Sequence, residues 1–205
     1  MIIKGWAGYP KVDTRYFEPK TVDEIQKKIK SKNIIARGNG RSYGDSAIGA
    51  TTTISMKNFN KIIFFNNTTG ELIAQSGLML KDVIEKFLPK GWFPYVTPGT
   101  KFVTLGGMVA ANVHGKNQHK EGCLINFINW IEIINPDGKL MKCSKDLNSE
   151  LFNWSVGGMG LTGIIVNISL NLRKVETSWI NQKILISNNL DKTFDLIEKN
   201  LNYSY

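Results

Sequence analysis

Glycines are grouped in this chain of 205 residues. Eleven of the 19 glycines fall into three groups: Gly38, Gly40 and Gly44; Gly99, Gly106, Gly107 and Gly115; and Gly157, Gly158, Gly160 and Gly163. Glycine costs backbone entropy on folding, so the grouping needs a reason, either tight turns or close approach of the backbone to a ligand. Three separate groups favour a large ligand that backbone N–H groups contact at several points.

The first group lies in the loop "ARGNGRSYGDSA", residues 36–47. A short apolar run precedes the loop and a β-rich run follows it, so we expect it to join two strands. Its N–H groups suit a pyrophosphate, to which Arg37 and Arg41 would add positive charge and Ser42 a hydroxyl donor. A phosphate would repel Asp45, so we expect the Asp45 carboxylate to hold the loop's own N–H groups.

The third group does not indicate a dinucleotide-binding Rossmann fold. Residues 158–163 match the spacing G-x-G-x-x-G, but that fingerprint follows a strand and opens a helix. Here a short helical stretch precedes the motif and the β-rich run "IIVNISLNL" follows it. The first loop has the spacing G-x-G-x-x-x-G and leads into a strand, so it does not fit the fingerprint either.

The second group lies in "TPGTKFVTLGGMVAANVHGKNQH". Gly106 and Gly107 can open a short helix of small residues, against which a flat ring or a phosphate can lie closely. His114 and His119 are the only histidines of the chain, and His114 stands near Lys116 and next to a glycine, which favours a functional role. The two histidines lack the H-E-x-x-H spacing and a third ligand, so no metal is expected.

Local patterns predict a mixture of helices and strands. Helices are expected at 21–30, 80–88, 147–153 and 190–201. Strands are expected at 33–36, 51–56, 61–66, 71–77, 162–172 and 178–186, with a hairpin over 130–144 and the start of another strand at 202–205. Thr21 and Glu24 are expected to form a capping box. Because strands and helices do not alternate strictly, we predict an α+β fold built from two small lobes.

The last predicted helix, 190–201, has an apolar face. The residues expected to point inward from this face are Leu190, Phe194, Leu196 and Ile197. This pattern predicts that the helix packs against the body of the protein.

Composition and charge exclude several classes of protein. Apolar residues make up 42% and charged residues 21%, as in ordinary globular domains. The net charge of +9 is dispersed, and its densest run, Lys27 to Lys32, falls on a predicted helix that also carries acidic residues. Because no aromatic residues are interleaved with basic ones, we do not expect nucleic-acid binding.

Neither the N-terminal sequence nor the spacing of the cysteines indicates a secreted protein. No apolar run approaches the ~20 residues of a membrane span, and the N-terminal sequence has no signal-peptide pattern. Cys123 and Cys143 do not form a C-x-x-C motif, so we expect two reduced thiols.

Three segments together carry a family resemblance: "ARGNGRSYGDSA", "TPGTKFVTLGGMVAANVHGKNQH" and "LFNWSVGGMGLTGIIVNISL". They resemble, in this order, the FAD-binding domain of the vanillyl-alcohol oxidase/PCMH flavoproteins. The elements "GRSYGD", "HGKN" and "VGGMGLTGI" look most like the branch that oxidises a polyprenylphosphoryl ribose. The resemblance covers nearly the whole chain.

The resemblance implies that FAD lies extended between two α+β lobes. The loop that would wrap its pyrophosphate comprises Ala36, Arg37, Gly38, Asn39, Gly40, Arg41, Ser42, Tyr43, Gly44, Asp45 and Ser46. The flavin and ribityl chain would be lined by Gly99, Thr104, Leu105, Gly106, Gly107, Ala111, Asn112, Val113 and His114, and contacted by the backbone of Ile164. The catalytic candidates are His114 and Lys116, facing the substrate side of the flavin, and Tyr43, bordering it.

Two departures from the family pattern carry further expectations. Many relatives attach FAD covalently through a histidine of the first loop, and Arg41 stands in that place. Arginine cannot form this bond, so we predict non-covalent FAD. Family members carry a substrate-binding domain after the FAD domain. We therefore expect residues 1–175 to form the FAD-binding PCMH-type domain and 176–205 to begin a truncated substrate domain, so the general base lies outside this chain.

The reaction implied by the resemblance is oxidation of a secondary alcohol of a sugar by hydride transfer to flavin N5. The favoured substrate is the 2′-hydroxyl of a polyprenylphosphoryl ribose, in epimerisation of a cell-wall arabinan precursor. The alternatives are an aldonolactone or alditol oxidase and, for this chain alone, an inactive FAD-binding module. The resemblance further implies a reductase or epimerase partner subunit and a cytoplasmic location, at the membrane surface if the substrate is lipid-linked, without an integral membrane segment.

Overall fold

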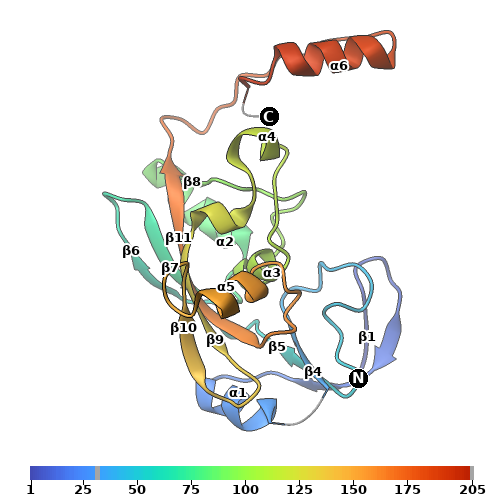
Figure 1. Ribbon diagram of the computed structural model, residues 1–205, viewed down its shortest axis with the longest axis vertical. Helices are drawn as coiled ribbons and strands as arrows, with labels where there is room; N and C mark the ends of the chain where they lie inside the picture. Colours follow the sequence, from blue (N-terminus) through green and yellow to red (C-terminus); the bar gives the residue numbers. More distant parts are fainter. Residues whose placement is uncertain (31–32, 204–205) are drawn as a thin grey trace.

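The computed structural model describes residues 1–30 and 33–203, which form two lobes and a helical arm (Figure 1). The first lobe contains β1 (Ile2–Lys4), β2 (Lys11–Asp13), β3 (Arg15–Phe17), α1 (Val22–Ile29), β4 (Ile34–Arg37) and β5 (Thr52–Ser55). Strands β1 and β2 form an antiparallel hairpin, and β3, β5 and β4 form a parallel sheet in that order. The α+β, two-lobed fold predicted from the sequence is confirmed.

The second lobe is built on an antiparallel sheet. Its elements are β6 (Ile62–Phe65), β7 (Glu71–Gln75), α2 (Leu80–Phe87), the 3₁₀ turn η1 (Leu88–Lys90), β8 (Trp92–Pro94), α3 (Leu105–Ala110), α4 (Gln118–Glu121), η2 (Leu124–Phe127), β9 (Ile128–Ile134), β10 (Leu140–Cys143), α5 (Ser149–Ser155) and β11 (Ile164–Lys174). The strand order is β10-β9-β11-β7-β6, and β8 pairs with the far end of β11. The long central strand β11 therefore supports the whole lobe.

Two apolar cores hold these layers. The larger core lies within the second lobe, where β7, β9 and β11 pack against α2, α3 and α5. The smaller core joins the lobes, because Ile25 of α1 and Ile54 of β5 pack with Ile134, Ile164 and Val166 of the second lobe. The link is reinforced where the Gln26 side chain donates a hydrogen bond to the Gly138 carbonyl at 2.8 Å. The lobes are thus fixed relative to each other.

The first helix begins close to its predicted position. Thr21 is the N-cap of α1, and its hydroxyl accepts a hydrogen bond from the Glu24 backbone N–H at 3.3 Å. The Glu24 carboxylate accepts from the backbone N–H of Lys20 at 2.8 Å, one residue before the N-cap. The predicted capping box is therefore correct on the threonine side and shifted by one residue on the glutamate side. Residues 31 and 32 of the basic run lie outside the described residues.

Most predicted strands are present with small changes at their ends. The runs 33–36, 51–56, 61–66 and 71–77 correspond to β4, β5, β6 and β7, and the hairpin to β9 and β10. Gly138, with φ +81°, closes this hairpin by donating to the Asn135 carbonyl at 2.9 Å. The turn at 57–60 joins β5 and β6, which belong to different sheets and therefore to different lobes.

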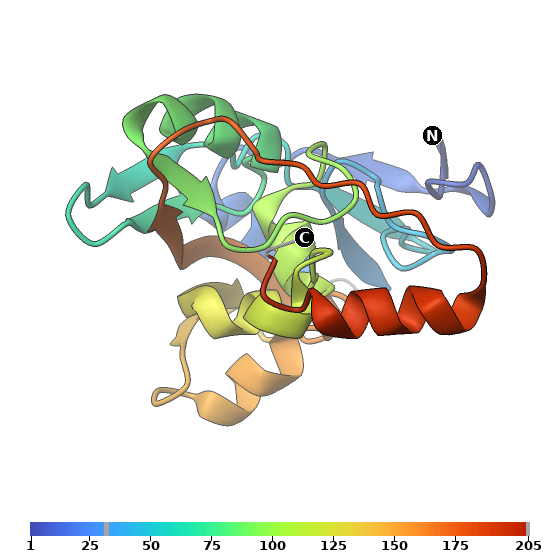
Figure 2. The same ribbon diagram turned by 90° about the horizontal axis from the view of Figure 1, so that it is seen from above.

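The expected strand at 178–186 is wrong, because this segment is extended without a pairing partner among the described residues. β11 ends at Lys174, and the next residue is still held by the hydrogen bond from Val175 N–H to the Gly91 carbonyl at 2.8 Å. Beyond it the chain crosses above the body to α6 (Leu190–Lys199), as Figure 2 shows. β-Branched residues favour strands only where another strand offers its edge.

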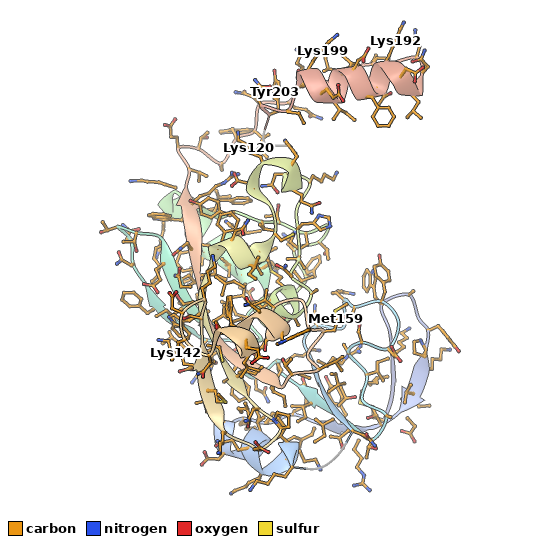
Figure 3. All side chains as sticks on the ribbon, viewed as in Figure 1. Lys120, Lys142, Met159, Lys192, Lys199 and Tyr203 are labelled. Atoms are coloured by element: carbon orange, nitrogen blue, oxygen red, sulfur yellow. The ribbon has the colours of Figure 1, made fainter. Side chains whose placement is uncertain are left out.

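The inward packing expected for the last helix is also wrong. Leu190, Phe194 and Ile197 are exposed, at 67%, 56% and 55%, and Leu196 is half-buried, because α6 lies away from both cores. The chain then returns to α4, where Lys120 donates to the Asn202 carbonyl at 3.3 Å, and Lys120 and Tyr203 lie close together in Figure 3. Residues 201–203 form a turn rather than the start of a strand, and 204–205 lie outside the described residues.

Candidate functional site

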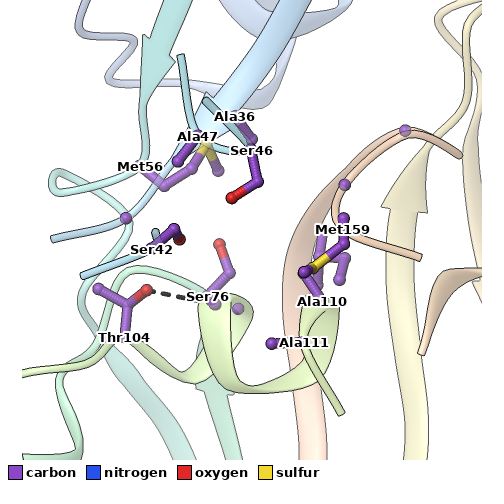
Figure 4. A pocket seen from close by; sticks show the side chains of 16 residues that line it. Ala36, Ser42, Ser46, Ala47, Met56, Ser76, Thr104, Ala110, Ala111 and Met159 are labelled. Carbon is purple, nitrogen blue, oxygen red and sulfur yellow. Dashed lines mark hydrogen bonds between the residues drawn. The ribbon is translucent and has the colours of Figure 1, made fainter. Parts of the chain in front are cut away.

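A cavity between the two lobes brings the three glycine groups together (Figure 4). The predicted site residues that line it are Ala36, Gly38, Ser42, Ser46, Thr104, Gly106, Gly107 and Ala111. Gly160 and Gly163 of the third group complete the wall. The cavity volume is about 70 Å³, smaller than the ~300–1,000 Å³ of pockets that enclose a whole small molecule, so the cavity encloses only part of a large ligand. Residues more than 100 positions apart thus share one site.

The first loop presents unused backbone donors. Among the described residues, none of the backbone N–H groups from Gly38 to Ala47 donates a hydrogen bond to another protein group. Gly40 and Gly44 have φ of +66° and +58°, a conformation that turns successive N–H groups toward one side. Such a concave run of donors, next to the Ser42 and Ser46 hydroxyls, suits the oxygens of a phosphate.

Asp45 does not hold this loop as the sequence suggested. Its side chain is exposed and makes no hydrogen bond with another described residue. The turn is closed instead by the Ile48 N–H, which donates to the Asp45 carbonyl at 2.8 Å, and by the Ser46 hydroxyl, which donates to the Tyr43 carbonyl at 3.0 Å. Backbone contacts therefore leave the loop's N–H groups free.

The two arginines of the loop face the β1–β2 hairpin instead of the cavity. Arg37 donates to the carbonyls of Ala47 at 3.1 Å and Lys4 at 2.9 Å. Burial lowers the pKa of its guanidinium, which still remains charged. The Arg41 guanidinium lies 4.0 Å from the centre of the Trp6 ring, a cation–π contact. Both arginines fix the outer side of the loop, and neither lines the cavity.

The second segment offers close backbone approach rather than free donors. The N–H groups of Leu105, Gly106 and Gly107 are bonded to Leu78 O at 2.8 Å, Ser76 O at 2.7 Å and Thr104 Oγ1 at 3.3 Å. A Cβ atom at position 106 would lie 2.7 Å from the Ser76 Cβ. Glycine is thus required here for α3 to pack against the turn after β7.

The third segment is tied to α3 by its backbone. The N–H groups of Gly157 and Met159 donate to Val109 O at 3.0 Å and Ala110 O at 2.8 Å. This pairing brings the Met159 side chain to the cavity wall (Figures 3 and 4), although the residue has an unfavourable φ of +54°. The strand β11 then begins at Ile164, directly beside the cavity.

The three catalytic candidates do not line the cavity. The side chains of His114, Lys116 and Tyr43 are exposed, with Tyr43 at 73%. His114 lies three residues beyond Ala111 in the same segment, and its Nδ1 is 3.2 Å from the Gly115 carbonyl oxygen. These side chains therefore stand outside the enclosed part of the site.

Other residues predicted to contact the cofactor have structural roles around the site. Asn39 donates to the Phe102 carbonyl at 2.9 Å, and the Asn112 side chain accepts from the Ile125 N–H at 3.0 Å. Leu105 and Ile164 are buried in the two cores. The remaining predicted residues that do not line the cavity are Arg37, Gly40, Arg41, Tyr43, Gly44, Asp45, Gly99, Val113 and His114.

Several lining residues were not among the predicted site residues. They are Ala47, Met56, Ser76, Ala110, Met159, Gly160, Gly163 and Ile165. The third glycine group had signalled two of them. No sequence pattern marked Ser76 as a site residue, because serine is common after strands.

Comparison with known proteins identifies the family. A sequence model of the FAD binding domain matches residues 14–144, nearly two thirds of the chain. The chain therefore belongs to the FAD binding domain family, and FAD is its cofactor. The cavity fits this cofactor, since it combines a run of N–H donors without a partner among the described residues with a lining of small residues.

Several curated relatives match much of the chain. The chain is 34% identical to decaprenylphosphoryl-beta-D-ribose oxidase of Mycolicibacterium smegmatis over 178 residues, covering 85% of the chain and 39% of the relative. It is 29% identical to D-lactate dehydrogenase of Anaerostipes hadrus over 134 residues, covering 63% and 28%. It is 26% identical to D-arabinono-1,4-lactone oxidase of Debaryomyces hansenii over 200 residues, covering 88% and 36%. The chain thus spans two fifths or less of the length of these relatives.

Two further features bear on the site's surroundings. Within residues 1–30 and 33–203, no helix is long and apolar enough to cross a membrane. In the same residues, no group of three or more His, Cys, Asp or Glu side chains is arranged to hold a metal ion.

Proposed function

We propose that this chain is the FAD-binding part of an oxidoreductase that oxidises a secondary alcohol of a sugar. The observation that carries the proposal is the convergence of the three glycine-rich segments on one cavity between the lobes. Bound there, FAD supplies a hydride acceptor, and the protein contributes binding and orientation. Family members that share this region, such as the relatives named above, are oxidases and dehydrogenases.

Each part of the chain has a role in this proposal. The loop from Gly38 to Ala47 binds the pyrophosphate through its free N–H groups, and α3 with the segment 159–165 forms the opposite wall. We assign His114 and Lys116 to the substrate side of the site, with Tyr43 at its rim. Their exposed side chains support this placement, because a substrate must reach them from outside the enclosed cavity.

FAD is bound non-covalently in this proposal. The guanidinium of Arg41 is engaged with Trp6, and an arginine cannot form the bond that a histidine makes to the flavin. Protein with bound FAD, denatured and analysed by mass spectrometry, should show the unmodified chain mass. A flavin adduct would overturn this assignment.

Residues 1–175 form the FAD-binding domain, and 176–205 are the first part of a substrate-binding domain. Two features support this division: among the described residues, none beyond Ile165 lines the cavity, and α6 exposes apolar side chains that a further domain would cover. A protein ending at residue 175 should keep the FAD affinity of the present chain. A tenfold loss of affinity would place the boundary elsewhere.

The substrate we propose is the 2′-hydroxyl of a polyprenylphosphoryl ribose. The 34% identity to an enzyme named for that substrate supports it, and such a lipid-linked sugar implies work in the cytoplasm at the membrane surface, with a reductase or epimerase partner. An aldonolactone oxidase is the second candidate, supported by the 26% identity to a D-arabinono-1,4-lactone oxidase.

Flavin absorbance tests the function directly. Purified protein should be yellow, and anaerobic addition of substrate to the protein with its complete substrate-binding domain should bleach the flavin band. Bleaching by a prenylphosphoryl ribose and not by D-arabinono-1,4-lactone supports the first substrate, and the reverse supports the second. Yellow protein that neither compound bleaches indicates an inactive FAD-binding module, whereas failure to bind FAD would overturn the whole proposal.

A further inference from the structure

Ser76 is a buried hydroxyl at the wall of the cavity. It lies in the turn after β7, is 2% exposed, and its Oγ has no hydrogen-bond partner within residues 1–30 and 33–203. Figure 4 shows this oxygen pointing into the space between Ser42, Ser46 and Met159. Buried hydroxyls in folded proteins almost always have a partner, so the unpaired Ser76 Oγ calls for a specific reason.

The backbone holds Ser76 in this position. Its N–H donates to the Val166 carbonyl at 2.8 Å, and its own carbonyl accepts from the Gly106 N–H at 2.7 Å. The residue is therefore locked between β11 and α3, and only rotation of the side chain is free. Its place at the wall is therefore fixed by β11 and α3, which both border the cavity.

Ser55 provides an internal comparison. It is the last residue of β5, is 0% exposed, and its Oγ also has no hydrogen-bond partner in the described part of the chain. Ser55 does not line the cavity, however. Two serines thus share burial and an unpaired hydroxyl, and they differ in whether a ligand in the cavity can reach them.

We propose that Ser76 Oγ forms a hydrogen bond with an oxygen of FAD. The inference rests on FAD occupying the cavity between the lobes. The Ser76 hydroxyl can donate to a phosphate oxygen or exchange a hydrogen bond with a ribityl hydroxyl. The Ser76 Oγ is itself shielded from solvent, so contact with the ligand involves a rotation of the Ser76 side chain about its Cα–Cβ bond.

The inference predicts opposite effects on the cofactor and on the empty protein. Ser76→Ala should weaken FAD binding about 3- to 10-fold, the fold-change that one neutral hydrogen bond supports. Without FAD, the same variant should melt at or above the wild-type temperature, because an unpaired buried hydroxyl has been removed. Ser55→Ala should show the same melting behaviour with unchanged FAD affinity.

The experiment titrates FAD into wild type, Ser76→Ala and Ser55→Ala, following flavin fluorescence, with melting curves of each protein without FAD. Equal FAD affinity in Ser76→Ala and wild type would overturn the inference, as would a lower melting temperature of Ser76→Ala without FAD. A wild type that does not bind FAD would instead overturn the proposed function.

The partner atom can be located with ADP as a competing ligand. If Ser76 contacts the pyrophosphate, Ser76→Ala should weaken the binding of ADP and of FAD by the same factor. If it contacts the ribityl chain, ADP affinity should be unchanged while FAD affinity falls. Weaker ADP binding with unchanged FAD binding would contradict the inference.

Discussion

Replacing Gly38 with alanine should strain the contact between the two lobes at the cavity. A Cβ atom at position 38 would collide with Thr104 Oγ1 and lie 3.1 Å from its Cγ2 and 3.2 Å from its Cβ. Carbon atoms pack best at about 3.5–4.0 Å. Rotating the Thr104 side chain would either bring its methyl group against the new Cβ in place of the hydroxyl, or break the hydrogen bond that the Thr104 hydroxyl accepts from the Gly107 N–H at 3.3 Å. Rotation of Thr104 therefore cannot relieve the strain without a new clash or the loss of this hydrogen bond.

The cost follows from these contacts. Overpacking of a buried site costs about 1–3 kcal/mol. For a chain of this length, 1 kcal/mol lowers the melting temperature by about 2–4 °C, so Gly38→Ala should lower it by about 2–12 °C. Thr104→Ala alone should cost about 1 kcal/mol through loss of the helix cap. The cost of the double variant should be about 1–2 kcal/mol less than the sum of the two single costs, because Oγ1 and Cγ2, two of the three Thr104 atoms that crowd the new Cβ, are gone.

Urea unfolding of wild type, both single variants and the double variant, without added FAD, measures this coupling. Gly99→Ala is the control, because a Cβ there would lie within 4 Å of no atom of the described residues. We expect this variant to unfold like wild type. Strictly additive costs of Gly38→Ala and Thr104→Ala would refute the steric argument.

Three further predictions concern other parts of the chain. Iodoacetamide should modify Cys123 before Cys143 at pH 8, because Cys143 is fully buried and burial raises the pKa of its thiol; equal rates in the folded protein would contradict this. Thr21→Ala should lower the free energy of unfolding by about 1 kcal/mol through loss of the N-cap of α1, and urea midpoints unchanged at equal slope would disprove it. Gly138→Ala should cost about 1–2 kcal/mol, because its φ of +81° is unfavourable for alanine; melting at the wild-type temperature would speak against it.

Local sequence patterns predicted the elements whose determinants are local. The cap at Thr21 and the turn at 135–138 each depend on residues within a few positions, so sequence was enough to place them. The third glycine group was correctly separated from a Rossmann fingerprint, since α5 precedes it and β11 follows it. The same local signals failed at 178–186 and on α6, where strand pairing and burial depend on a distant partner.

The sequence by itself determined that glycines recur at three places, and hence that backbone approaches something closely there. Only the tertiary structure decided that these places share one cavity, that Arg37 and Arg41 turn away from it, and that Ser76 turns toward it. The physical reason is that backbone conformation is set by near neighbours. The direction in which a side chain finds its partner is set by segments that the fold brings together, such as Trp6 beside Arg41, and β11 and α3 on either side of Ser76.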